Sequence, residues 1–155
     1  MIRRLVSGGQ TGVDRAALDI AIELGIEHGG WCPRGRRAED GPLDERYLLT
    51  ETKSANYAVR TERNVIDSDA TLILYRKPLS SGTRLTLRLA QKHERDYLLV
   101  EIGDDADGSA DEVIRWINSI SSIEAKTLNV AGPRESSRPT IYEHARAVLK
   151  KALDT

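Results

Sequence analysis

The chain has 155 residues, of which 39% are hydrophobic and 30% charged, and its formal net charge is −1. These values suit one domain over residues 1–155 and give no global reason to expect a nucleic-acid partner. The single cysteine, Cys32, excludes an internal disulfide, and the lack of both a signal-peptide core and an apolar run of about 20 residues favours a cytoplasmic protein without a membrane segment.

Strand-like runs alternate with helical patterns from the N-terminus onward. A first strand is predicted at 3–8, followed by a helix that begins at Val13 and ends at Gly25. A second, glycine-weakened strand is expected at 27–33. The polar stretch 34–55 after it is too long for an ordinary connection, so it is a candidate functional loop.

The same alternation continues to the C-terminus. The predicted helices of this part cover 59–69, 80–93, 109–120 and 140–153, and the predicted strands cover 70–75, 96–102 and 127–132. Ser109 followed by Glu112 resembles a capping box, so Ser109 is the predicted N-cap of its helix. Five strands that alternate with helices predict an α/β domain, a three-layer sandwich with a mainly parallel five-stranded sheet.

Three loops that follow predicted strands share a composition typical of anion sites. They read SGGQTG, SSGT and GPRESSRP, and each combines glycine or small hydroxyl residues with the start of a helix. Glycine lets backbone amides approach a ligand, and a helix N-terminus carries about half a positive charge. One such loop could be a tight turn, and GGQTG matches neither the dinucleotide fingerprint nor the P-loop. All three together predict a phosphate-sized cleft.

The candidate ligand-binding residues come from these loops and from one arginine-rich segment. Amides of 9–12 and 82–83 would hold the anion, hydroxyl groups would add donors, and Arg34 or Arg134 would supply charge. The full set is Gly8, Gly9, Gln10, Thr11, Gly12, Asp14, Arg34, Ser81, Gly82, Thr83, Gly132, Arg134 and Glu135.

Several of these signals have structural alternatives. Asp14 stands where the first helix begins and could simply cap it. The arginines of WCPRGRRAEDG could be neutralised by Glu39 and Asp40 of the same segment, and Glu62 could pair with Arg60 or Arg63. The three histidines are scattered without metal-like spacing, so we predict no metal bound directly by side chains.

The segments GGQTGVDRAALD, GWCPRGRRAEDG, RTERNVIDSDATLIL, SGTRLT and NVAGPRES, in this order, resemble the putative molybdenum carrier family. This family is a circularly permuted branch of Rossmann-like proteins, related to molybdenum cofactor carrier proteins and to the lonely-guy phosphoribohydrolases. The resemblance implies the strand order 2-1-5-3-4, which would place residues 132–135 beside 8–12 and 81–83. It also leads us to expect assembly into oligomers.

One departure from the related hydrolases bears on function. Their catalytic glutamate, three residues after the threonine of the glycine-threonine helix start, corresponds to Thr86 here, which follows Thr83. This favours binding over N-glycoside hydrolysis. The resemblance therefore implies a carrier of a phosphorylated pterin or nucleotide-like ligand, with molybdenum cofactor (molybdopterin) as the example. A nucleotide-processing hydrolase that uses Asp14 or Glu135, and a nucleotide-sensing module, are the alternatives.

Overall fold

A computed structural model describes residues 2–120 and 126–154 of the chain. Residues 1, 121–125 and 155, which the predicted domain includes, lie outside this part. The elements of the described chain are β1 (Ile2–Val6), α1 (Val13–Leu24), β2 (Glu27–Gly29), β3 (Trp31–Cys32), β4 (Thr50–Glu51), α2 (Tyr57–Ile66), β5 (Ala70–Tyr75), α3 (Ser81–Lys92), β6 (Asp96–Glu101), α4 (Ala106–Ser119), β7 (Lys126–Ala131) and α5 (Ile141–Leu153).

The main sheet has the order β2-β1-β7-β5-β6, and every pair of neighbours is parallel. Counted along the chain, its strands follow the expected order 2-1-5-3-4. One detail differs from the prediction. The expected second strand is split at Gly30 (φ 118°) into β2 and β3, and β3 leaves the main sheet to pair with β4 of the 34–55 loop.

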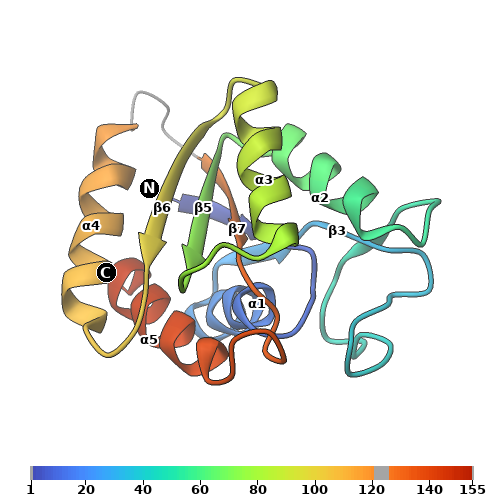
Figure 1. Cartoon of the computed structure of the whole chain (residues 1–155), viewed down its shortest axis with the longest axis horizontal. Coiled ribbons are helices and arrows are strands. Elements are labelled where there is room, and N and C mark those ends of the chain that lie inside the picture. The colour runs from blue at the N-terminus through green and yellow to red at the C-terminus, as the bar shows by residue number, and fades with distance from the viewer. Residues whose placement is uncertain (1, 121–125, 155) are drawn as a thin grey trace.

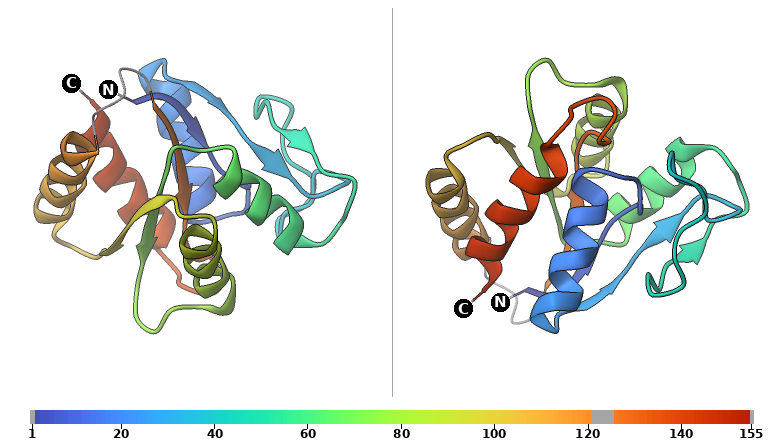
Figure 2. Two further views of the ribbon diagram at one scale, coloured as in Figure 1. Left: turned by 90° about the horizontal axis from the view of Figure 1, so that it is seen from above. Right: turned by 90° about the horizontal axis from the view of Figure 1, so that it is seen from below.

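Helices cover both faces of the sheet, as predicted (Figure 1). The larger core lies between the sheet and the helices α1, α4 and α5, where Leu72, Leu74 and Leu149 are fully buried. Figure 2 shows α1 and α5 side by side on this face. A smaller cluster built on Val65 and Leu89 joins α2 to α3 on the other face. The strand β5, with five of its six residues buried, is mostly apolar without alternation because it is covered on both sides.

One predicted helix start is wrong. The helix α4 begins at Ala106, because the Asp105 side chain accepts a hydrogen bond from the Gly108 amide at 2.9 Å. Ser109 is a buried residue inside the helix rather than its cap. The acidic, glycine-containing run GDDADG resembles a loop, but its second aspartate is a strong N-cap residue.

The 34–55 loop wraps the outer face of α1. Leu43, Tyr47 and Leu49 of the loop pack with Leu18 of α1 and with Cys32, which is fully buried as expected of a small apolar residue. The loop therefore has an apolar core of its own and holds a fixed position beside the β1–α1 turn. Within the described part of the chain, no helix is long and apolar enough to cross a membrane.

Candidate functional site

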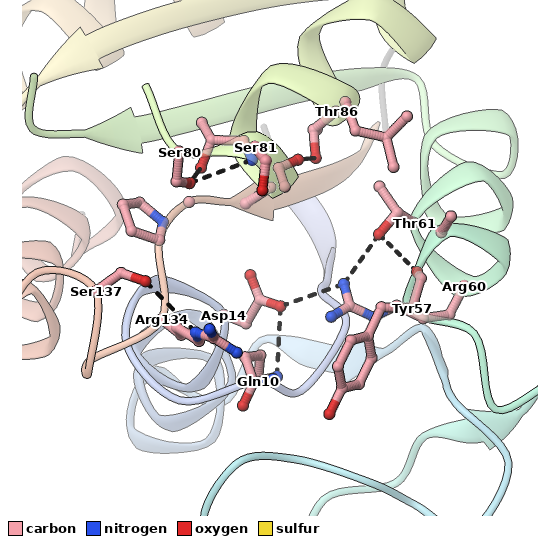
Figure 3. Close-up of a pocket in the computed structure, with 17 residues that line it drawn as sticks. Gln10, Asp14, Tyr57, Arg60, Thr61, Ser80, Ser81, Thr86, Arg134 and Ser137 are labelled. Atoms are coloured by element: carbon pink, nitrogen blue, oxygen red, sulfur yellow. Dashed lines mark hydrogen bonds and ion pairs between the residues drawn. The ribbon is translucent and has the colours of Figure 1, made fainter. Parts of the chain in front are cut away.

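The strand order places the loops after β1, β5 and β7 next to one another, because β7 lies between the other two strands. A cavity of about 240 Å³ opens at this edge of the sheet. Its walls come from the β1–α1 loop, α2, the first turns of α3 and the β7–α5 loop (Figure 3). Ligands of open parallel sheets bind in this position, outside the carboxyl ends of the strands.

The structure brings about half of the predicted ligand-binding residues together. The cavity is lined by Gln10, Asp14, Ser81, Gly82, Thr83, Gly132 and Arg134 of that set. In the described chain, Gly8, Gly9, Thr11, Gly12, Arg34 and Glu135 lie outside its lining.

Three of the loop glycines stand at close packing contacts within the protein. A Cβ on Gly8 would lie 2.3 Å from Nη1 of Arg60, and one on Gly12 would lie 2.3 Å from the carbonyl oxygen of Pro133. A Cβ on Gly9 would lie 2.7 Å from the Leu43 side chain. Residues of α2, the 34–55 loop and the β7–α5 loop therefore pack against the backbone of the β1–α1 loop at its glycines.

Amides of this loop already have acceptors within the protein. The Gly9 amide donates to Oγ of Ser7 at 3.4 Å, the Gln10 amide to Oδ2 of Asp14 at 3.4 Å, and the Thr11 amide to its neighbour Gln10 at 3.0 Å. An anion at amides 9–11 would have to displace these bonds. An anion at the first turn of α3 would displace fewer hydrogen bonds, because the leading N–H groups of a helix have no intrahelical acceptor.

Asp14 lies at the bottom of the cavity, with its side chain only 5% exposed. It does not cap α1; its Oδ2 accepts from the Gln10 amide and lies 3.7 Å from Nη1 of Arg60. Burial raises the pKa of Asp14 from its ordinary value of 3.8 to about 6, although Arg60 and the amide bonds act to lower it. A carboxyl group with such a pKa inside a cavity is typical of functional sites.

Arg60 is a lining residue that the sequence analysis missed. It comes from α2 together with Tyr57 and Thr61, and its guanidinium lies against Gly8, 5.4 Å from the centre of the Tyr57 ring. The alternative that Glu62 pairs with Arg60 or Arg63 is wrong, because Glu62 contacts His93 at 2.9 Å. The glycine at position 8 leaves room for a large side chain, but nothing in the sequence identifies that side chain as Arg60.

The arginine-rich segment does not enter the cavity. Arg36 donates to the carbonyl groups of Asp44 and Tyr47 at 2.9 and 2.8 Å and so holds the 34–55 loop in shape. Arg37 lies 5.6 Å from the centre of the Tyr57 ring. The alternative that the acidic residues of the segment neutralise its arginines is also wrong, since Asp40 pairs with Arg15 at 2.9 Å.

Glu39 instead ties three loops together behind the cavity. Its carboxylate accepts from the Ser136 amide at 3.1 Å and hydroxyl at 2.5 Å, accepts from the Thr11 hydroxyl, and lies 3.6 Å from Nε of Arg134. Burial acts to raise the pKa of Glu39, but the bonds from Ser136 and Thr11 outweigh it and lower the pKa. Thr11 thus has a structural role, and Arg134 is held at the cavity wall.

We expect Glu39→Gln to lower the free energy of unfolding by about 1–2 kcal/mol at pH 7, because hydrogen bonds to a charged acceptor are replaced by neutral ones. A group whose folded pKa is lowered stabilises above its unfolded pKa of about 4.3, and the contribution is lost in acid. Urea unfolding at pH 7 and pH 3.5 should therefore show a larger difference at the higher pH. Asp40→Asn is the matched control. Because the Asp40 side chain is half-exposed, its loss should lower the free energy of unfolding by less than the loss of Glu39 does. An equal decrease in the two variants would contradict the role of Glu39.

A model of the circularly permutated YpsA SLOG family matches residues 5–153. The chain belongs to this family. A solved structure of a putative molybdenum carrier protein from Syntrophus aciditrophicus SB is 42% identical, with a TM-score of 0.88, and the match covers 98% of this chain and 95% of that one. No curated protein matches the chain. These findings agree with the resemblance and with the Rossmann-like α/β fold.

Two of the positions considered for catalysis have local roles within this family fold. Thr86 lines the cavity, and its hydroxyl donates to the Gly82 carbonyl at 3.2 Å. The Glu135 carboxylate accepts from the amides of Thr140 and Tyr142 at 2.8 and 3.0 Å, so it caps the start of α5. Asp14 is therefore the carboxyl group that lines the cavity, and in the described chain no cluster of three metal-ligating side chains is found.

Proposed function

We propose that this protein is a cytoplasmic carrier that binds a small phosphorylated ring compound, a phosphorylated pterin or a nucleotide, in the cavity beside β1, β5 and β7. The observation that carries the proposal is the meeting, in one cavity, of the first turn of α3 with the guanidinium groups of Arg60 and Arg134. A net charge of −1 would not attract an anion to the chain as a whole. The positive charge is local.

The phosphate group would bind at the first turn of α3. The Ser80 side chain caps this 12-residue helix, and the amides of Ser81 and Gly82 belong to its first turn. Such amides point away from the helix and favour a negative group. A Cβ built on Gly82 has no atom of the described chain within 4 Å, so there is open space at this position for the oxygens of a ligand.

The remaining walls suit a ring of modest size. Tyr57, Ala58 and Leu85 bring apolar surface to the cavity next to the hydroxyl groups of Thr61 and Thr86. A volume of about 240 Å³ suits a single phosphorylated ring system better than a dinucleotide. The name of the 42% identical structure makes molybdenum cofactor, which contains a phosphorylated pterin, the example of this class to which we extend the proposal.

Gly82→Ala tests the phosphate position. The added methyl group meets no protein atom of the described chain, so stability should be unchanged or higher by up to about 1 kcal/mol, as for glycine-to-alanine changes in helices. Binding of ribose 5-phosphate and AMP, measured by calorimetry, should weaken about tenfold as the methyl group fills the anion position. Unchanged affinity would refute this position, and no rise in melting temperature with either compound or with a pterin phosphate would refute the proposed function.

A hydrolase is the second candidate, and one observation favours it. Asp14 is a buried carboxyl group in the cavity with a pKa of about 6, as expected of a general acid or base. Prolonged incubation with nucleoside monophosphates separates the two functions. A carrier returns the nucleotide intact, whereas release of free base that stops in Asp14→Asn would replace the carrier function with hydrolysis.

A further inference from the structure

Asp14 and Arg60 form a buried ion pair at the cavity, and the two side chains do not use all of their hydrogen-bonding capacity. Their side chains are 5% and 12% exposed, and the 3.7 Å between Oδ2 and Nη1 is longer than a hydrogen bond. Nη1 of Arg60 donates to Oγ1 of Thr61 at 3.1 Å, and its Nε has no acceptor in the described part of the chain. Buried charges are normally paired closely, so this pair retains capacity for a ligand.

The pair lies away from the proposed phosphate position. Figure 3 shows Ser80 and Ser81 above Asp14 in the view, with the Arg60 guanidinium beside Asp14 and Gln10 below it. One oxygen of Asp14 carries the contacts to Arg60 and to the Gln10 amide, and its other oxygen is turned toward the cavity. A ligand whose phosphate binds at α3 would therefore meet Asp14 and Arg60 with its ring end.

We propose that Asp14 and Arg60 select a 2-amino-4-oxopyrimidine ring, the edge that guanine and pterins share. This edge presents an amino group, a ring N–H and a carbonyl oxygen in a row. The Asp14 carboxylate would accept from the two N–H donors, and the Arg60 guanidinium would donate to the carbonyl. The inference rests on the proposed function, which supplies the phosphate position and the cavity.

Other ring edges and the sugar match this pair less well. Adenine offers one donor and one acceptor and leaves half of the carboxylate unused. Hypoxanthine lacks the amino donor of guanine, and a ribose diol offers no carbonyl to Arg60. A site built to bond a donor discriminates strongly against an analogue that lacks it, because a buried polar group is then left unpaired.

The pH dependence of binding follows from the same contact. The charged groups near Asp14 are Arg60 of α2, Arg15 of its own helix and Arg134 of the β7–α5 loop, with Glu39 on the far side of Thr11. Only the ionised carboxylate accepts both N–H groups, and the pKa of free Asp14 is raised to about 6 by burial. The affinity for GMP, relative to that for ribose 5-phosphate, whose phosphate titrates in the same range, should therefore fall about tenfold for each pH unit below 6.

Calorimetric titration of the full chain with GMP, IMP, AMP and ribose 5-phosphate tests the inference. At pH 7.5, GMP should bind at least about tenfold more tightly than IMP or AMP, the effect of one hydrogen bond to a charged group. In Asp14→Asn the preference for GMP over IMP should disappear while ribose 5-phosphate binds as before. Asp40→Asn, which removes a carboxylate outside the cavity lining, should retain the preference.

The outcomes separate this inference from the function on which it rests. Equal affinities for GMP and IMP in the unmodified protein, or binding of GMP that strengthens below pH 6, would overturn the ring assignment and leave the phosphate site standing. Failure of all four compounds to bind would remove the phosphate site and the inference with it. The comparison of GMP with IMP and the pH series need no variant, so they hold even where Asp14→Asn does not fold.

Discussion

Gly12→Ala is expected to lower the free energy of unfolding by about 3 kcal/mol or more, the combined cost of a left-handed alanine and of overpacking. Gly12 has φ 78°, and a Cβ there would lie 2.3 Å from the carbonyl oxygen of Pro133 and 2.8 Å from the amide of Glu135. Both contacts are with backbone, which cannot rotate away as a side chain can. Relief would require the β7–α5 loop to separate from α1, whose Val13 amide donates to Pro133 at 3.3 Å.

Two other glycines provide matched controls for this change. Gly25 has φ 70°, but a Cβ there meets no described atom within 4 Å, so Gly25→Ala should cost only about 1 kcal/mol of conformational strain. Gly82→Ala has neither strain nor contact. In urea unfolding, the loss in the free energy of unfolding should therefore be much larger for Gly12→Ala than for Gly25→Ala, and larger for Gly25→Ala than for Gly82→Ala. If Gly12→Ala loses no more stability than Gly25→Ala, the β7–α5 loop can move away from Gly12 without loss, which would contradict the prediction.

Much of the fold could be predicted because its signals are local. The run ATLILY is apolar at every position but its polar threonine and terminal tyrosine, and it forms the strand β5 with the predicted bounds. The end of α1 at Gly25 follows from a left-handed residue whose amide bonds to the carbonyls of Ala21 and Ile22. Strand order is not a local property. It came from the resemblance to a family, since no periodicity records which strands become neighbours.

The site was harder to predict because a glycine in a sequence can indicate either an amide open to a ligand or a position where another segment packs closely. In SGGQTG the glycines suggest amides open to a phosphate, whereas Gly8, Gly9 and Gly12 provide room for Arg60, Leu43 and Pro133. Those partners come from segments 34 to 121 positions away, so only the folded chain reveals them. The convergence of three loops was within reach of the sequence; the identity of the side chains that α2 adds to the cavity was not.

The second large effect concerns the pH dependence of stability. The folded pKa of Asp14 is about 6 against an ordinary value of 3.8, so between these values the folded state binds the extra proton. Stability contributed by this group is therefore present at pH 4 and lost as the pH rises toward 7. The free energy of unfolding of the unmodified protein, relative to that of Asp14→Asn, should fall by about 2 kcal/mol over this range.

The relative measurement isolates the titration, because any fixed effect of leaving Arg60 without its carboxylate is the same at every pH. Asp40→Asn is a control that should be nearly flat: the hydrogen bond from Arg15 lowers the pKa of Asp40 below 3.8, so its contribution is already present at pH 4 and is lost only in stronger acid. Urea unfolding at half-unit steps from pH 4 to pH 7 measures both. A flat difference for Asp14→Asn would show that Asp14 is not desolvated. A decline of the expected size would mean that the fold keeps a charged group in its cavity at a cost to stability, which is reasonable where the ionised carboxylate meets a ligand.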